Sequence, residues 1–185
     1  MFPPPAEVLL LRDVSGERFI ERYNEQRFTD IVYLSTYRDP IIQAAIKACK
    51  FHRSERAAKL LGLLFMQWLN KQSKHYLIVP IPLSNERKRE RGYNQVERIL
   101  KTTDVTMHTS LLQKSIHTPP QTSLSKAERT ENLHGSFSVT TSSNIKGQHI
   151  LLVDDVVTTG STFAAARAAL APHSPASITC LALAH

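Results

Sequence analysis

The sequence predicts an α/β fold built on a mainly parallel sheet. Short apolar runs rich in β-branched residues alternate along the chain with longer segments whose apolar residues recur at helical spacing. This alternation is typical of strands joined by crossover helices, which make parallel sheets. With 185 residues, of which 42% are hydrophobic, the chain is long enough for one complete core and too short for two.

The first half of the chain contains two predicted strands and two predicted helices. Residues 30–39, DIVYLSTYRD, indicate a strand at a hairpin edge, and residues 76–82, YLIVPIP, indicate a buried strand that leaves the sheet at its prolines. Pro40 suits the first turn of one helix, and Ser54 is a candidate N-cap of the next. We interpret the broad apolar face of this second helix as core rather than as a cofactor-binding surface. Its members are Ala57, Leu60, Leu61, Leu64, Phe65, Trp68 and Leu69.

The second half alternates in the same way after a basic segment that ends at Arg91. Residues 94–101 indicate a helix, and the residues from Val105 onward indicate a strand entering the core. Residues 115–135 are polar and weakly patterned, which predicts a long mobile loop. The last predicted elements are a strand after Gly147, an alanine-rich helix over residues 162–170 and a strand over residues 176–185.

The run ILLVDDVVTTGST, residues 150–162, carries the strongest functional signal. Asp154 and Asp155 lie at the predicted carboxyl end of a strand, where open α/β sheets bind ligands. Hydroxyl residues and Gly160 lead into a helix N-terminus, which favours a phosphate, so the run suits a ribose 5-phosphate. The alternative is that the aspartates are solvated and TTGST only caps a helix. The motifs GxxxxGK[ST] and GxGxxG are both excluded.

The charge of the chain favours anionic partners, either phosphorylated small molecules or nucleic acid. Lys and Arg total 23 against 16 Asp and Glu, for a formal net charge of +7. The segment ERKRER, residues 86–91, places four cations in six residues and suits a pyrophosphate group. A solvated charge run and a nucleic-acid patch are its alternatives.

The remaining composition bears on compartment and domain organisation. Cys49 and Cys180 lie far apart without a CxxC pair, which argues against a disulfide framework and against structural zinc. The first residues lack the pattern of a signal peptide, and no later run approaches a membrane span. We therefore expect a cytoplasmic protein that is neither exported nor embedded in a membrane. Residues 1–29 are predicted to be an N-terminal extension, and residues 30–185 a single domain.

Three segments resemble a known family. VDDVVTTGST resembles the phosphoribosyl pyrophosphate signature of the type I phosphoribosyltransferases. VPIPLSNERKRERGYNQ, residues 79–95, is similar to the segment that marks their ComF-like branch, named for competence and DNA-uptake proteins, and YRDPIIQAAIKACKF resembles that branch's upstream helix. The resemblance spans roughly residues 37–185 and implies the type I phosphoribosyltransferase fold with a mobile hood loop. The hood spacing rests on Gln121, Arg129, Asn132 and Phe137.

The resemblance implies a role for each matched position. Asp154 and Asp155 would be the catalytic residues and would hold the ribose hydroxyls, directly or through magnesium-bound water. The signature residues that would bind the ribose and the 5-phosphate are Asp154, Asp155, Val156, Val157, Thr158, Thr159, Gly160, Ser161 and Thr162. The residues that would approach the pyrophosphate, most of them in the loop after Pro80, are Lys50, Pro80, Arg87, Arg91, Gly92 and Asn94. Gln121 and Arg129 would belong to the hood loop.

The implied function is transfer of ribose 5-phosphate from magnesium phosphoribosyl pyrophosphate, with release of pyrophosphate, in DNA uptake and natural competence. The alternative is a non-catalytic phosphoribosyl pyrophosphate sensor or a competence factor that binds single-stranded DNA. Competence or recombination proteins and a second copy of the chain, in a homodimer, are further expected partners. The acceptor and the general base stay open, since His108, His117 and His134 are candidates by loop position only.

Three departures from the family pattern limit the resemblance. ComF-like proteins commonly carry a zinc-binding CxxC ribbon, which this sequence lacks, so no zinc is expected. Thr158 stands where hypoxanthine-type enzymes have an aspartate that assists the purine, which weakens an interpretation as a purine-salvage enzyme. Lys114 and His117 stand where family members often have arginines, and the charge at His117 depends on pH.

Overall fold

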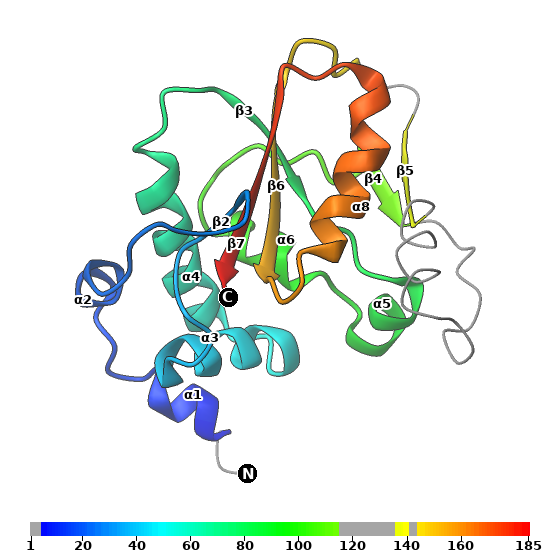
Figure 1. The fold of residues 1–185 in the computed structure, drawn as a ribbon. Helices are drawn as coiled ribbons and strands as arrows, with labels where there is room; N and C mark the ends of the chain where they lie inside the picture. The colour runs from blue at the N-terminus through cyan, green and yellow to red at the C-terminus, as the bar shows by residue number, and fades with distance from the viewer. Residues whose placement is uncertain (1–4, 115–135, 141–143) are drawn as a thin grey trace.

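The computed structural model describes residues 5–114, 136–140 and 144–185, and its centre is a five-stranded sheet (Figure 1). The strand order is β1-β2-β7-β6-β3. β1 and β2 form an antiparallel hairpin, and every other pair of neighbours is parallel, which confirms the mainly parallel α/β sheet. The five strands are β1 (Gln26–Phe28), β2 (Ile31–Tyr33), β3 (Tyr76–Pro80), β6 (His149–Val156) and β7 (Ser177–Ala184).

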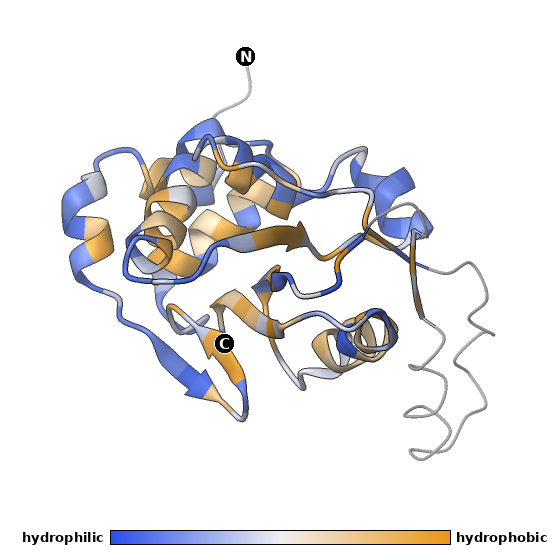
Figure 2. Ribbon diagram, turned by 90° about the horizontal axis from the view of Figure 1, so that it is seen from above, coloured by the Kyte–Doolittle hydropathy of each residue, from blue (hydrophilic) through white to orange (hydrophobic). Residues whose placement is uncertain are grey.

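Helices cover both faces of this sheet. α3 (Pro40–Phe51), α4 (Glu55–Leu69) and α6 (Gln95–Lys101) cover one face, while α8 (Ser161–Leu170) covers the other together with a separate two-stranded sheet (Figures 1 and 2). That small antiparallel sheet consists of β4 (Leu112–Lys114) and β5 (Phe137–Val139). Among the described residues, the remaining helical elements are α1 (Ala6–Leu10), α2 (Gly16–Glu21), α5 (Asn85–Arg91) and the 3-10 turn Ala171–His173. No helix in the described ranges has the length and apolar run that a membrane crossing requires.

Successive residues of the central strand β6 point into two different cores. Leu151 and Val153 pack with α3, α4 and α6, whereas Ile150 and Leu152 pack with α8. A strand that is buried on both faces reads as one continuous apolar run, which is how ILLV appears in the sequence. The hydropathy colouring shows this apolar centre between polar outer surfaces (Figure 2).

The two predicted helices of the first half are confirmed, including their starts. The Asp39 carboxylate accepts hydrogen bonds from the N–H groups of Ile41 and Ile42, at 2.8 and 3.3 Å, and Pro40 occupies the first turn of α3. Ser54 Oγ accepts from the N–H of Ala57 at the start of α4, at 3.3 Å. The apolar face of α4 is core, as predicted.

Two predicted elements differ in the structure. Beyond Val105, only Met107 bridges to Ile78 of the main sheet, and regular pairing begins at Leu112 in the small sheet. The side chains of Val105 and Met107 pack on the core. These residues are therefore apolar because they are partly buried, and not because they form a strand. The strand expected over residues 30–39 is confined to Ile31–Tyr33, which pair with β1 in a hairpin and with β7 on the other side.

The basic segment placed in a loop after Pro80 is instead the helix α5. Ser84 Oγ accepts from the N–H of Arg87 at its start, and Gly92, with φ +74°, ends it by donating its N–H to Lys88 O at 2.8 Å. No residue of α5 is buried. A helix without a buried face has no apolar periodicity for a sequence analysis to detect.

Residues before position 30 contribute to the main core. Leu11 and Phe19 are fully buried in the cluster formed by α3 and α4, and Tyr23 is nearly so. The Arg56 guanidinium of α4 donates to Val14 O at 2.8 Å and so ties this segment to the helical layer. The division of the chain at residue 30 stays a prediction, and the loop predicted over residues 115–135 lies outside the described residues.

Candidate functional site

The candidate site lies where the carboxyl ends of β3 and β6 meet. Immediately after β3, the N–H of Ile81 donates to Val153 O of β6 at 2.8 Å. The Asn94 side chain then donates to Ile81 O at 2.9 Å, which holds the start of α6 against the same edge. The loop after Pro80 and the acidic pair of β6 therefore share one edge of the sheet.

Asp155 is buried and held from two sides. Its side-chain Oδ2 receives the Lys50 ammonium of α3 at 2.9 Å and the Gln95 amide of α6 at 3.0 Å, and the residue is only 4% exposed. A buried carboxylate is tolerated when a charge pairs with it and hydrogen bonds satisfy its oxygens. The alternative that both aspartates are merely solvated therefore fails for Asp155.

Gln95 extends this contact toward the basic helix α5. The Arg91 guanidinium donates to Gln95 Oε1 at 3.0 Å, so Arg91, Gln95, Asp155 and Lys50 form one continuous chain of polar contacts, here called the Asp155 network. Gln95 is 3% exposed. Gln95 was not among the predicted site residues, although it closes the segment VPIPLSNERKRERGYNQ, because an uncharged residue beside a charge run gives no signal of its own.

Asp154 differs from its neighbour. The residue as a whole is partly exposed, and the one hydrogen bond described for its side chain is accepted from the N–H of Asp155, at 2.8 Å. Burial raises the pKa of the Asp154 carboxyl well above its usual range, and the adjacent Asp155 raises it further, while Lys50 and Arg87 offset part of this. A carboxyl group with so little compensating charge can accept a cation or sugar hydroxyls.

The turn after β6 leads directly into the N-terminus of α8. Gly160 adopts φ +77° as the N-cap residue, and a Cβ there would lie 2.9 Å from Ile31 Cδ1 of β2. The N–H of Ser161 makes a long hydrogen bond to Thr159 Oγ1, at 3.4 Å, and Gly160 has no side chain to cap the helix, so further N–H groups of the first turn are available to an anion. A cavity of about 420 Å³ borders this turn and is lined by Thr159, Gly160 and Ser161 on one side and the β1–β2 turn on the other.

The residues expected near a pyrophosphate are only partly brought together. Lys50 and Arg91 belong to the Asp155 network. Arg87 is exposed on α5, yet it lies close enough to lower the pKa values of both Asp154 and Lys114. Pro80 ends β3, Gly92 ends α5, and Asn94 caps α6 by accepting from the N–H of Val96 at 2.9 Å.

Only the flanks of the expected hood loop belong to the described part of the chain. Gln121, Arg129, Asn132, His117 and His134 lie outside the described residues. Phe137 is buried in β5, and Lys114 Nζ lies 5.6 Å from its ring centre. Burial, followed by the nearby Arg87, lowers the pKa of Lys114. His108 uses its backbone N–H to bind Ile78 O at 2.9 Å.

Beside the Asp155 network, aromatic rings and guanidinium groups alternate on the surface. Arg91 lies 5.6 Å from the centre of the Phe51 ring, which is 63% exposed. Tyr93 lies against two further guanidinium groups, Arg53 at 5.0 Å and Arg98 at 5.4 Å. We call these five residues the Phe51/Tyr93 cluster. Its members come from two segments far apart in the chain, so the sequence could not show that they meet.

Comparison with known proteins gives a family match over the second half of the chain. The family model described as "Phosphoribosyl transferase domain" matches residues 89–185. A solved hypoxanthine phosphoribosyl transferase from Trypanosoma cruzi aligns with 69% of this chain and 62% of its own, at a TM-score of 0.43 and 16% sequence identity.

Curated relatives match a longer part of the chain. It is 38% identical over 112 residues to "Competence protein ComFC" of Bacillus subtilis, covering 60% of this chain and 45% of the relative. It is 30% identical over 149 residues to "Competence protein F" of Haemophilus influenzae, covering 75% of this chain and 65% of the relative. It is 32% identical over 144 residues to "DNA utilization protein YhgH" of Escherichia coli K12, covering 72% of this chain and 62% of the relative. The chain thus spans 45% to 65% of the length of these relatives.

Proposed function

The chain belongs to the phosphoribosyltransferase domain family, in its ComF-like branch, and we propose that it binds magnesium phosphoribosyl pyrophosphate at the carboxyl ends of β3 and β6. The observation that carries the proposal is that Asp154, near the carboxyl end of β6, and the Gly160 turn, which follows β6, lie at the same edge of the sheet. The uncapped start of α8 suits the 5-phosphate. Asp154, partly exposed and short of compensating charge, suits the ribose hydroxyls or a cation bound to them.

The pyrophosphate group lies, in this proposal, on the side of the Asp155 network. Lys50 and Arg91 provide positive charge there, and Arg87 adds a more exposed cation on α5. Hydrogen-bond donors and cations stabilise the charge that develops on a departing pyrophosphate. Lys50 is already paired with Asp155, so a ligand phosphate competes with that carboxylate for the ammonium group.

The residues present fit a magnesium ion that arrives with the substrate. Magnesium is usually held in proteins by one or two carboxylates together with substrate phosphates and water. Asp154 offers such a carboxylate, whereas Asp155 Oδ2 is already occupied by Lys50 and Gln95. When bound in this way, magnesium supplies positive charge to the leaving group.

We propose further that the bound ribose 5-phosphate is transferred to an acceptor. The bond between C1 and the pyrophosphate oxygen breaks, pyrophosphate leaves with the electron pair, and a lone pair of the acceptor forms the new bond to C1. The names of the curated relatives support a role in competence and DNA use. A cytoplasmic location, competence or recombination partners and a homodimer stay predictions.

Calorimetry of magnesium phosphoribosyl pyrophosphate with the wild type and with Asp154→Asn tests the binding site. We expect the wild type to bind and Asp154→Asn to bind at least about tenfold more weakly, because a charged oxygen is lost from the ribose and cation contacts. Asp13→Asn, which changes an exposed aspartate in the turn after α1, is the control. Absence of wild-type binding, or equal binding by all three proteins, contradicts the proposal.

The Phe51/Tyr93 cluster favours a second function, binding of single-stranded DNA. Proteins that hold single strands combine cations that follow the phosphates with aromatic rings on which bases stack. Phe51 offers an exposed ring, and a cavity of about 270 Å³ beside it is lined by Lys50, Arg53, Arg91 and Tyr93. The net charge of +7 supports attraction of a polyanion.

Fluorescence anisotropy with a labelled oligothymidylate tests this second function. Phe51→Ala should weaken binding by about 1–3 kcal/mol through the loss of stacking, and wild-type affinity should fall steeply with salt. Leu10→Ala, at an exposed apolar residue of α1, is the matched control. An affinity that does not depend on salt, or equal weakening by both substitutions, counts against the cluster. Binding of phosphoribosyl pyrophosphate by Phe51→Ala should be unchanged, which separates the two functions.

A further inference from the structure

The strand β7 is paired along only part of its second edge. On one side it pairs with β6 from Ser177 onward. On the other side β2 begins to pair only at Cys180. Within the described parts of the chain, Ser177, Ile178 and Thr179 therefore have a strand neighbour on the β6 side alone. An unpaired strand edge is a template for another extended segment.

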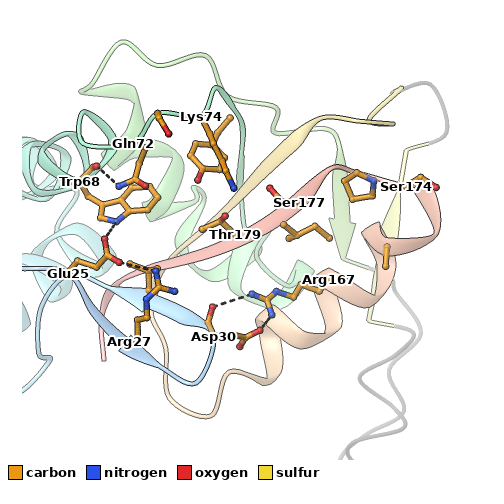
Figure 3. A pocket seen from close by; sticks show the side chains of 16 residues that line it. Glu25, Arg27, Asp30, Trp68, Gln72, Lys74, Arg167, Ser174, Ser177 and Thr179 are labelled. Atoms are coloured by element: carbon orange, nitrogen blue, oxygen red, sulfur yellow. Dashed lines mark hydrogen bonds and ion pairs between the residues drawn. The ribbon is translucent and has the colours of Figure 1, made fainter.

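A cavity of about 730 Å³ opens at this unpaired edge (Figure 3). It lies at the amino ends of the strands, opposite the candidate phosphoribosyl site. Ser177, Ile178 and Thr179 line it, as do residues of the β1–β2 hairpin and residues from the helical layers on both faces of the sheet. Its volume is within the range of ligand pockets.

The two sides of the cavity have different chemistry. Trp68, Gln72 and Lys74 line one side, and Asp30 and Arg167 line the other (Figure 3). Since side chains of a strand alternate between the two faces, a segment added beside β7 would point its residues by turns toward Lys74 and toward Arg167. Thr179 shares the face of Leu181, which packs with α4, while Ile178 packs with α8.

Hydrogen bonds and ion pairs join several residues of the cavity lining. Trp68 Nε1 donates to Glu25 Oε2 at 2.8 Å, and Arg27 pairs with the other oxygen of Glu25 at 3.1 Å. Arg167 pairs with Asp30 and so ties the hairpin turn to α8. These contacts satisfy both carboxylates of the lining. Lys74 belongs to none of the ion pairs described among the placed residues.

We propose that this cavity, which we call the amino-end notch, binds an extended acidic peptide segment of a partner protein. The segment adds a short strand to the free edge of β7. The backbone of the segment pairs with Ser177–Thr179, and an acidic side chain reaches Lys74. The lining favours a negative segment because Arg27 and Arg167 are paired with its two carboxylates, Glu25 and Asp30, which leaves the Lys74 ammonium group as an excess positive charge among the described lining residues. The proposal is independent of the phosphoribosyl site, which lies at the opposite ends of the strands.

Amide NMR of the ¹⁵N-labelled full chain tests the proposal with the peptide acetyl-Val-Glu-Val-Glu-Val-amide. We expect saturable shifts of the amides of Ser177, Ile178 and Thr179, with a Kd below about 1 mM, and slower hydrogen exchange at one or more of them. The same peptide with lysine in place of glutamate should bind at least about fivefold more weakly, and a peptide with proline at its centre should not bind.

Two charge reversals in the α4–β3 turn localise the contact. Lys74→Glu should weaken binding at least about fivefold, whereas Lys71→Glu, three residues earlier and outside this cavity, should leave it unchanged. No shift at Ser177–Thr179 with the glutamate peptide overturns the proposal, as does binding that maps elsewhere. Equal binding of the glutamate and lysine peptides overturns the choice of an acidic occupant.

Discussion

Asp154 and Asp155 stand side by side in the sequence, yet their surroundings are unlike. The charge of Asp155 is compensated before any ligand arrives, by Lys50 and Gln95. Asp154 has a backbone N–H as its hydrogen-bond donor and a raised pKa. The motif predicted an acidic pair at a strand end, but it could not distinguish the two roles, because the partners of Asp155 come from α3 and α6.

Lys50→Met tests how much the Asp155 network contributes to stability. Removing the ammonium group leaves a buried carboxylate with the Gln95 amide alone, so we expect a loss of roughly 3 kcal/mol in the free energy of unfolding. Urea denaturation measures it. Lys47→Met is the matched control on the same helix, where, among the described residues, the ammonium group donates to Gln43 Oε1 alone, at 3.1 Å. Equal losses in the two variants would show that the ion pair is not responsible.

Asp154→Asn should change how stability depends on pH. The folded state raises the pKa of Asp154 above its value in the unfolded chain, so its contribution to stability is present below the unfolded pKa and is lost as pH rises through the raised value. Asparagine does not titrate, and its side-chain oxygen can still accept the N–H of Asp155. The free energy of unfolding of the variant should therefore be higher than that of the wild type at about pH 8, by on the order of 2 kcal/mol. This difference should vanish toward about pH 4.

Thermal melts of the wild type and Asp154→Asn across this pH range make the measurement. A constant difference in Tm at every pH would be inconsistent with a raised pKa for Asp154.

At the scale of elements, the helices and strands that could be predicted are those whose buried residues recur at a regular spacing in the sequence. α3 and α4 have apolar faces and side-chain caps, so both their type and their starts could be predicted. α5 buries nothing and is strongly polar along its length (Figure 2), so its charges indicated a loop. β4 has only three residues and pairs outside the main sheet, and three residues are too few to show a period of two.

The turn between β6 and α8 can be tested with two glycines of similar conformation. Gly160→Ala should cost about 1–2 kcal/mol from the positive φ, with an added cost from the approach of the new Cβ to Ile31. Gly147→Ala, at φ +71° with open space around it, should show the conformational cost alone. We also expect Gly160→Ala, and not Gly147→Ala, to weaken binding of phosphoribosyl pyrophosphate, which calorimetry measures. Unchanged binding by both variants would exclude the Gly160 turn from the site.

At the scale of the whole molecule, the parallel sheet offers two different edges. The carboxyl ends of β3 and β6 gather the acidic pair, the Gly160 turn and the basic residues around Lys50 and Arg91. This edge was predictable, because parallel strands followed by polar motifs must end together. The cavity at the amino ends was not predictable, since it depends on where β2 begins relative to β7. Strand register depends on how the two strands pair in the assembled sheet, so the sequence of either strand alone does not determine it.

Amide NMR with magnesium phosphoribosyl pyrophosphate tests the central claim most directly, because it reports which edge of the sheet the ligand occupies. We predict saturable shifts of the amides from Thr158 to Thr162, together with those of Asp154 and Gln95, and no response at Ser177–Thr179. The proposed site would be contradicted if amide shifts saturated with the ligand elsewhere in the chain while those of residues 158–162 did not change. Shifts confined to the amino-end notch would contradict it as well.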